Sequence, residues 1–299
     1  MKVTLLTHNW GHPWVEGFKQ SFEERGHEYG VFPYGADAYI HAWSDGSTTP
    51  ADNAVNIFYL RRFEYYTDGP ERILWEHVDH LVCVNQWFAD QMSLRLGKSC
   101  PPISVIHNAV YPGKWTFKER KPGKSIGMVC HVHPKKNLQL AALILAALPE
   151  GYSLHIAGKV QDQCTVDYLN WFAKKTKRQI YIYGKIPAEQ MNFWWEQHQY
   201  CLSTSLSEGC PNNVIEAMAK GIKPIVHRWP GAETMFPETF LTVDQAVNQI
   251  LSPDYFSLNY LNQVGERFSV RNNEKLVDLV EHYHALRTMN DGRRAVSEG

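Results

Sequence analysis

A short loop before a helix-like stretch carries the residues whose types and spacing are best suited to chemistry. It reads Ser-Leu-Ser-Glu-Gly-Cys-Pro-Asn-Asn over residues 205–213, and Gly221 follows the helix-like stretch. We expect Asn212 to cap the start of this helix and Gly221 to end it. Backbone N–H groups in the first turn of a helix, together with the helix dipole, attract anions. The loop is therefore a candidate anion site, with two carboxylates, Glu208 and Glu216, beside it.

The spacing of the two glutamates resembles the E-x7-E element of the retaining GT-B glycosyltransferases of family 4. Further motifs that resemble the family, in the family's order between residues 103 and 287, are IHNAV (106–110), KN (136–137), LHIAG (154–158), YIYGKI (181–186), AKGIKPIV (219–226) and ERFS (266–269). Several spaced matches are more specific than any single motif. The resemblance implies a GT-B fold of the α/β class, in which two Rossmann-like, doubly wound parallel-sheet domains face a central cleft.

The resemblance also implies roles on the donor side. Glu208 would contact hydroxyls of the donor sugar, Glu216 would accept hydrogen bonds from the nucleotide ribose, and Lys136 matches the family's diphosphate lysine. A cation there stabilises the charge that gathers on the departing diphosphate. His131 stands where the family usually has arginine, and a histidine makes diphosphate binding pH-dependent. The other donor-binding residues implied are Ser205, Gly209, Cys210, Pro211, Asn212, Asn213, Gly158, Gly184, Lys185 and Ile186.

The first part of the chain resembles the family more weakly and would form the acceptor side. Residues 9–12 take the place of the family's small-residue loop after the first strand, and two arginines follow a later strand end, where a surface loop is the alternative interpretation. His41 resembles a family histidine near the sugar, so it joins Glu208, Lys136 and His131 as a candidate catalytic residue. The candidates for acceptor contacts are Trp10, Gly11, His12, Arg61 and Arg62.

The reaction implied by the resemblance is transfer of a hexose or pentose from a nucleotide-diphosphate sugar, UDP- or GDP-sugar, to a hydroxyl with retention of configuration. The favoured mechanism is front-face attack, in which the departing phosphate takes the acceptor proton. We expect no cofactor beyond this donor and no metal, because no D-x-D motif occurs in the sequence. The cluster Cys130-His131-x-His133 looks like a metal site, but it lacks a second ligand pair at structural-zinc spacing. The cluster Glu76-His77-x-Asp79-His80 is interpreted as a polar helix end, with a metal or catalytic site as the alternative.

Three alternatives remain open for the acceptor and the activity. The acceptor is either an envelope glycan or lipid-linked glycan, or a hydroxymethylated base in DNA, as in phage enzymes, with aromatic side chains receiving a flipped base. Residues 1–118 contain 10 Lys and Arg against 13 Asp and Glu. This acidic excess does not favour binding to DNA, and the segment has no basic patch that would bind a membrane. The third alternative is a non-catalytic protein of the same fold that binds nucleotide sugars or glycans.

The elements that must position these residues alternate between strands and helices. Alternation of this kind produces parallel sheets covered on both faces, which bind ligands at the carboxyl ends of their strands. We also expect Trp194, Trp195 and Phe193 to anchor a helix to the sheet. The expected strands are 2–7, 30–34, 38–43, 55–60, 80–84, 103–106, 125–130, 153–157, 179–183, 199–203 and 222–226, and the expected helices include 70–78, 86–96, 137–148, 164–176, 188–197 and 212–220.

The length of 299 residues fits two domains, and the sequence KERKPGK at 118–124 is typical of a linker because it is charged and contains Pro and Gly. We expect an N-terminal acceptor-side domain at 1–118 and a donor domain at 119–271. The remaining residues, 272–299, are expected to form a helix that crosses back to the first domain.

Composition excludes several classes of protein. Apolar residues make up 44% of the chain and charged residues 20%, which excludes a disordered chain. No apolar run reaches the ~18 residues that span a bilayer, and the first residues do not resemble a signal peptide, so we expect a cytoplasmic protein without an integral membrane segment. The six cysteines form no CxxC pair and are expected to be reduced. The net charge of −1 excludes general attraction to nucleic acid, although residues 119–190 hold 11 Lys and Arg against 5 Asp and Glu.

Overall fold

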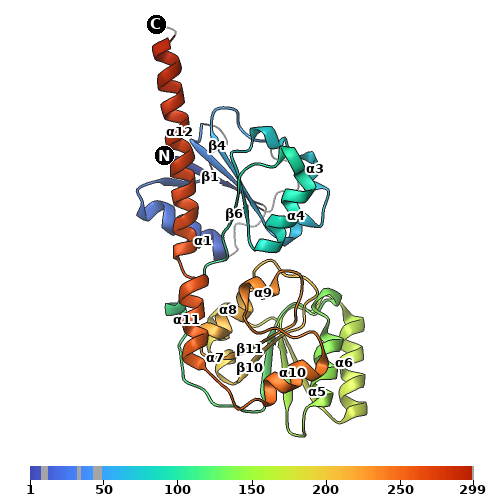
Figure 1. Cartoon of the computed structure of the whole chain (residues 1–299). Helices are drawn as coiled ribbons and strands as arrows, with labels where there is room; N and C mark the ends of the chain where they lie inside the picture. Colours follow the sequence, from blue (N-terminus) through green and yellow to red (C-terminus); the bar gives the residue numbers. More distant parts are fainter. Residues whose placement is uncertain (8–12, 32–34, 43–48, 298–299) are drawn as a thin grey trace. The chain divides into compact units, whose positions relative to one another are not determined.

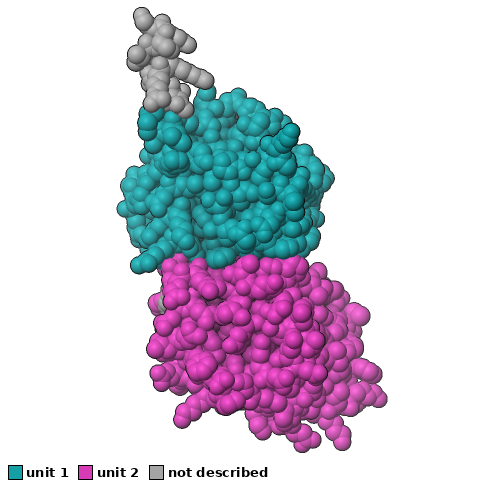
Figure 2. Space-filling model, in the orientation of Figure 1, with its two compact units in different colours: residues 1–109, 270–299 teal, residues 110–269 magenta. Residues whose placement is uncertain are grey.

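The computed structural model describes residues 1–7, 13–31, 35–42 and 49–297, and each of its two compact units contains one parallel β-sheet (Figure 1). Unit 1 consists of residues 1–109 and 270–299, and unit 2 of residues 110–269, as Figure 2 colours them. The prediction of two doubly wound parallel-sheet domains is confirmed.

Unit 1 has a six-stranded sheet in the order β2-β1-β3-β4-β5-β6, and every described pair of neighbouring strands is parallel. Most of these strands are short apolar runs that are buried on both faces, as parallel strands usually are. The strands are β1 (Lys2–Leu6), β2 (Glu28–Gly30), β3 (Ala38–Ala42), β4 (Val55–Leu60), β5 (His80–Cys83) and β6 (Ile103–Val105).

The helices of unit 1 cover both faces of this sheet, with α12 and α4 on opposite sides in Figure 1. They are α1 (Pro13–Glu24), α2 (Arg62–Tyr65), α3 (Gly69–Arg72), α4 (Gln86–Leu96) and α12 (Arg271–Ser297), with single 3₁₀ turns at Trp75–His77 and Gly97–Ser99. The prediction of one helix at 70–78 is wrong. Ile73 is extended, and the Trp75 indole N–H turns back to the carbonyl of Pro70 at 2.8 Å, so the segment folds as two short turns.

The C-terminal helix α12 packs against α1 and β4 within unit 1. Its apolar side chains Leu276, Val277 and Val280 are fully buried. Polar contacts also hold it. The Tyr283 hydroxyl lies 3.0 Å from Nδ1 of His80, and Arg287 binds both carboxylate oxygens of Asp79 at 3.0 Å.

Unit 2 has a five-stranded sheet in the order β11-β10-β7-β8-β9, again with parallel neighbours. The order reverses at β7, whose neighbours β8 and β10 lead to opposite ends of the sheet. This is the topological switch point at which open α/β sheets bind ligands. The strands are β7 (Ser125–Val129), β8 (Ser153–Ala157), β9 (Gln179–Gly184), β10 (Tyr200–Ser203) and β11 (Lys223–Val226).

Two apolar clusters lie on the two faces of the unit 2 sheet. One face packs against α5 (Leu138–Ala147), α6 (Gln163–Thr176) and α10 (Val243–Leu251). The other packs against α7 (Ala188–Glu196), α8 (Asn212–Ala219), α9 (Ala232–Met235) and α11 (Ser257–Arg267). Figure 1 shows α7, α8 and α11 on one side of the strands and α5 and α6 on the other. Trp194 and Trp195 are buried there as predicted, but Phe193 is 70% exposed, so its predicted anchoring role is wrong.

The connecting segment at 110–122 packs with unit 2. The Val110 backbone N–H donates to the carbonyl of Phe268 at 2.7 Å, and the Arg120 guanidinium donates to the carbonyl of Lys220 at 3.1 Å. Residues 110–118, which the linker motif would assign to the first domain, therefore group with the second sheet.

Candidate functional site

The loops that follow β7 and β10 lie against each other at the carboxyl edge of the unit 2 sheet. β7 and β10 are neighbours, although about seventy residues separate them in sequence. The Thr204 hydroxyl donates to the carbonyl of Lys136 at 2.7 Å, and the Leu206 backbone N–H donates to the carbonyl of Lys135 at 3.0 Å. These bonds fix one loop on the other at the switch point.

Lys136, Glu208 and Ser205 form a hydrogen-bonded cluster where these loops meet. The Lys136 ammonium and the Ser205 hydroxyl both donate to Oε1 of Glu208, the latter at 2.7 Å. The side chains of Lys136 and Glu208 are each 14% exposed. Oε2 of Glu208 has no hydrogen-bond partner among the described residues. The carboxylate is therefore held by one oxygen and offers the other to a ligand.

The pKa of Glu208 lies below its ordinary value. Burial acts to raise it, but the charge of Lys136 and the hydrogen bonds from Lys136 and Ser205 together outweigh burial. Glu208 is therefore ionised at neutral pH and acts as an acceptor of hydrogen bonds.

A tight turn positions Lys136. Residues 134–136 form a 3₁₀ turn that Pro134 opens, and the His133 ring accepts a hydrogen bond from the backbone N–H of Lys135 at 3.2 Å. Asn137 then adopts the left-handed conformation with φ of 49°, which lets α5 start at the next residue. His131 lies on the same loop, and its pKa is below the ordinary value, first because of partial loss of hydration and then because Lys136 and Lys135 are near.

Glu216 lies on α8, one helix turn beyond the loop that holds Glu208. Its carboxyl group is half-buried, and no side chain or backbone group of the described residues makes a hydrogen bond or ion pair with it. Burial raises its pKa to about 8. Loss of hydration with no compensating partner among the described residues perturbs this pKa, and this marks Glu216 as a group suited to binding a ligand.

Gly158 lets the loops after β7 and β8 approach each other. Its φ is +153°, and a Cβ atom there would lie 1.9 Å from the carbonyl oxygen of Cys130. Its backbone N–H donates to the carbonyl of Gly184 at 2.7 Å, which ties in the end of β9. Gly184 has φ of +71°; Lys185 after it is exposed, and Ile186 packs against the core. The donor-side candidates after three neighbouring strands thus gather at one edge.

The helix after the loop begins as predicted, with one difference. α8 starts at Asn212, and Pro211 is its N-cap, so the prediction of Asn212 as the cap is wrong. Pro211 fits because its extended ψ of 94° leads into the helix, while Asn212 and Asn213 form the first turn. The prediction that Gly221 ends the helix is confirmed, since it follows the C-cap Lys220 with φ of +75°. Gly209 and Cys210 are half-buried beside this helix start.

Two residues that are not among those predicted from the sequence help to hold the site. Thr204 is fully buried and bonds to the loop of Lys136. His227, the first residue after β11, lies with Nδ1 3.0 Å from the carbonyl oxygen of Ser205. The only sequence signal for His227 is its position directly after an apolar strand, at the carboxyl edge.

The acceptor-side candidates belong to unit 1. Trp10, Gly11 and His12 lie outside the described residues. Arg61 is buried, with its guanidinium 4.2 Å from the ring centre of Trp14, and it donates to Asn108. Arg62 is half-buried over the ring of Tyr66 at 5.5 Å. Their roles in binding an acceptor stay predictions.

His41 lies on β3 inside unit 1 and is 1% exposed. Its ring stacks on Phe58 with 4.2 Å between ring centres, and Nε2 lies 3.3 Å from the Asn56 side-chain oxygen. Burial lowers its pKa to about 4, so the ring is neutral at neutral pH. This arrangement fits a role in packing, and a catalytic role stays a prediction.

The described residues contain no cluster of three or more His, Cys, Asp or Glu side chains suited to a metal ion. Of the two sequence clusters, His80 is engaged with Tyr283 and with the Ser104 hydroxyl at 2.8 Å. Within the same described part of the chain, no helix combines the length and apolarity needed to cross a membrane.

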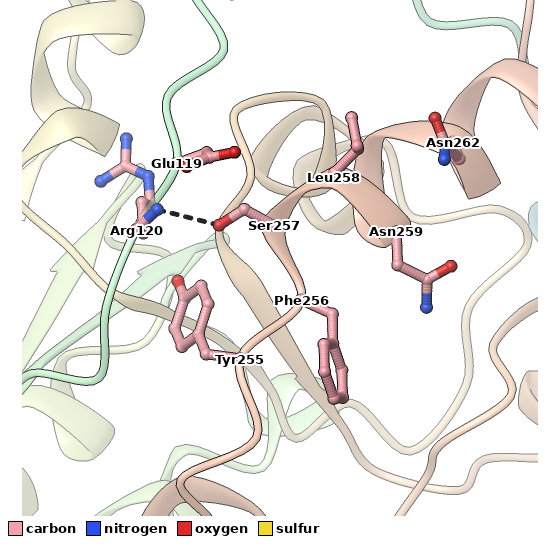
Figure 3. Close-up of a pocket in the computed structure, with 8 residues that line it drawn as sticks. All are labelled: Glu119, Arg120, Tyr255, Phe256, Ser257, Leu258, Asn259 and Asn262. Atoms are coloured by element: carbon pink, nitrogen blue, oxygen red, sulfur yellow. Dashed lines mark hydrogen bonds between the residues drawn. The ribbon is translucent and has the colours of Figure 1, made fainter.

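A pocket of about 680 Å³ lies at the opposite edge of the unit 2 sheet (Figure 3). There the Arg120 backbone N–H donates to Ser257 Oγ at 3.0 Å, and its guanidinium donates to the carbonyls of Lys220 and His198, which precede β11 and β10. The pocket therefore lies near the amino ends of β10 and β11. The cluster around Glu208 lies at the carboxyl edge, where parallel sheets bind ligands, so the two are separate.

Comparisons with known proteins give a family match within unit 2. Residues 123–253 match the model of the family described as Glycosyl transferases group 1. No curated protein sequence matches the chain.

Solved structures match most of the chain at low sequence identity. Sucrose-phosphate synthase from Thermosynechococcus elongatus has a TM-score of 0.76 and 11% identity, over 95% of this chain and 99% of that one. HepE from Anabaena, in complex with UDP and glucose, has a TM-score of 0.69 and 12% identity, over 94% and 99%. A mutant of S. aureus TarM, in complex with fondaparinux, α-GlcNAc-glycerol and UDP, has a TM-score of 0.67 and 15% identity, over 81% of this chain and 55% of the TarM chain.

At these identities the likeness is one of fold. The chain has the GT-B fold, and the match to the model of Glycosyl transferases group 1 covers residues 123–253 of it.

Proposed function

We propose that the protein is a retaining glycosyltransferase of family 4 that transfers a sugar from a UDP- or GDP-sugar to a hydroxyl of a glycan. The observation that carries the proposal is the cluster of Lys136, Glu208 and Ser205 at the switch point of unit 2, with the unpartnered Glu216 carboxyl on the adjoining helix. The family match over the same residues supports it.

The proposed roles follow from the hydrogen-bonding capacity of each group. Lys136 directs one N–H to Glu208, and an ammonium has two further donors for oxygens of a diphosphate. The start of α8 adds the positive end of a helix dipole. Oε2 of Glu208 would accept a hydrogen bond from a sugar hydroxyl, and Glu216 would accept hydrogen bonds from the ribose.

The proposed mechanism assigns no covalent role to Glu208. Its carboxylate is engaged by Lys136 and Ser205 and has a lowered pKa, which suits an acceptor of hydrogen bonds. The acceptor oxygen would then attack from the face that the diphosphate leaves. The new glycosidic bond forms as the bond to the phosphate oxygen breaks, and that oxygen takes the acceptor proton. Stabilisation of the leaving diphosphate by Lys136 lowers the barrier.

A glycan acceptor is favoured by what related structures contain. The TarM mutant of the same fold holds UDP together with fondaparinux and α-GlcNAc-glycerol, and HepE holds UDP and glucose. The excess of acidic residues in 1–118 argues against duplex DNA at the acceptor side.

The test begins with thermal stabilisation by a panel of UDP-, GDP- and ADP-sugars, since a ligand that binds the folded state raises the melting temperature. We expect one nucleotide class to stabilise the protein. Glu216→Gln should reduce the shift with nucleotide and nucleoside alike. Glu208→Gln should reduce the shift with the nucleotide sugar more than the shift with the nucleotide.

The matching sugar is then offered with glycan acceptors, and NMR of the product's anomeric proton decides between retention and inversion. Binding without transfer to any acceptor, and without donor hydrolysis, would favour a non-catalytic binding protein. If none of these compounds stabilised the protein, both the proposed glycosyltransferase and the non-catalytic binding protein would be contradicted.

A further inference from the structure

The loop that carries Ser205 and Glu208 is held from the side of β11 as well as from the side of β7. The His227 backbone N–H donates to the carbonyl of Ser203 at 2.8 Å. The His227 ring then reaches further along the loop, where Nδ1 lies 3.0 Å from the carbonyl oxygen of Ser205. His227, directly after β11, thus contacts both the last residue of β10 and the loop that follows it.

The chemistry of the partner fixes the state of the His227 ring. A carbonyl oxygen only accepts hydrogen bonds, so Nδ1 must carry the proton in this contact. The ring also packs against Phe240, with 5.5 Å between ring centres. His227 therefore has two separable features, a ring shape that fills space beside Phe240 and a donor that fixes the Ser205 peptide.

Ser205 connects His227 to Glu208 through two hydrogen bonds. Its carbonyl accepts from His227, and its hydroxyl donates to Oε1 of Glu208 at 2.7 Å. Ser205 is 3% exposed, so its peptide has no room to reorient without moving these neighbours. Rotation of the peptide would redirect the hydroxyl and release the oxygen that fixes the carboxylate.

We infer that His227 is a positioning residue that, through the carbonyl and hydroxyl of Ser205, sets the orientation of the Glu208 carboxylate. The inference rests on the proposed function only in assigning Glu208 to the donor sugar. His227 itself need touch no substrate. The donor at Nδ1, rather than the ring shape, is what the site requires.

Three substitutions separate the donor from the ring. The side-chain amide of Asn reaches the position of Nδ1, so His227→Asn keeps a donor for Ser205. His227→Gln carries its amide further out, near the position of Nε2, and His227→Phe keeps the ring against Phe240 without any donor. Melting temperatures establish that each variant is folded before it is compared.

The first readout needs no donor sugar. The side-chain carboxyl carbons of glutamate are labelled with ¹³C, Glu208 is assigned from Glu208→Gln, and its titration is followed by NMR. Loss of the Ser205 hydrogen bond should raise the pKa of Glu208 by roughly half a unit to one unit in the Gln and Phe variants, and His227→Asn should match the parent. Equal titration in the parent and in folded Gln and Phe variants would overturn the inference.

The second readout is transfer from the donor that the nucleotide panel identifies. We expect kcat to fall about tenfold in the Gln and Phe variants and to stay within about threefold in His227→Asn, with the Kd of the sugar-free nucleotide unchanged in all three. Wild-type protein that binds no nucleotide would refute the proposed function, while the titration would still decide the role of His227.

Discussion

Lys136 and Glu208, 72 residues apart in sequence, form an ion pair that joins the loops after two neighbouring strands of unit 2. Each side chain is mostly buried, and Ser205 donates to the same carboxylate oxygen. The pair therefore serves two purposes. It holds the loops together, and it keeps a carboxylate and a cation side by side where the sheet order predicts a ligand.

Replacement of this lysine should separate diphosphate binding from nucleoside binding. In Lys136→Ala we expect the Kd of the nucleoside diphosphate to rise at least tenfold, since a charge-assisted contact is worth about 1.5–3 kcal/mol, whereas the nucleoside should bind as before. Isothermal titration calorimetry measures both. Lys174→Ala, an exposed lysine on α6, is the matched control and should change neither. An equal loss for the nucleoside and the diphosphate would place Lys136 away from the phosphates.

The Glu216 carboxyl should make stability depend on pH in a defined window. Its pKa is about 8 in the folded chain, against 4.5 for the ordinary group. Below pH 4.5 both states hold the proton and the folded state is fully favoured. As pH rises toward 8, the unfolded chain releases the proton and the folded chain keeps it, so stability falls, and above pH 8 this decline ends.

Chemical denaturation at several pH values checks this window. Glu216→Gln, which cannot ionise, should remove this part of the decline and should be more stable than the parent above neutral pH. Glu189, an exposed acidic residue in the first turn of α7, supplies the control Glu189→Gln, which should keep the slope of the parent. An unchanged slope in Glu216→Gln would show that the carboxyl is ionised in the folded chain.

Two glycines at the same edge should respond differently to alanine. Gly158→Ala brings a Cβ to 1.9 Å from the Cys130 carbonyl oxygen, so the backbone must move, and we expect a loss of at least about 3 kcal/mol. Gly184→Ala meets only open space and should cost about 1 kcal/mol, for its φ of +71° alone. Urea denaturation of both variants measures the difference. Equal losses would mean that the loops after β7 and β8 lie further apart.

His41 should not titrate in the physiological range. Because burial lowers its pKa to about 4, its ring signals in NMR should stay constant from pH 8 down to pH 5. The folded chain keeps this ring neutral while the unfolded chain takes up a proton below pH 6.5, so His41 lowers stability as pH falls from 6.5 to about 4. A midpoint near 6.5 would show that the ring reaches water.

The alternation of strands and helices was predictable because each element has a local signature. The strands of unit 2 are apolar runs, and turn residues such as Gly221 separate them from helices. The segment at 70–78 lacked such a signature, because the Trp75 contact with Pro70 depends on folding that brings both into one turn. For Phe193 the secondary structure was predicted correctly but the burial of the side chain was not. Its helix is as predicted, but an apolar residue on a helix still faces water when no neighbour covers it.

The site was predictable where its residues share one stretch of sequence. Ser205, Glu208 and Glu216 lie in one loop and helix, and Lys136 has a motif of its own. His227 has neither. It reaches Ser205 because β10 and β11 are neighbours in the sheet, and strand order is a property of the whole domain. The same holds for Thr204, whose partner Lys136 lies on a loop that only the sheet brings near.

The division of the chain has a consequence for its synthesis on the ribosome. Unit 2 is continuous from residue 110 to residue 269, whereas unit 1 needs residues 1–109 and α12. The sheet of unit 1 leaves the ribosome before unit 2, yet the helix that buries Leu276 and Val280 is made after unit 2. Unit 2 can therefore complete its core during translation, while the side chains of unit 1 that pack against α12 stay uncovered until that helix is made.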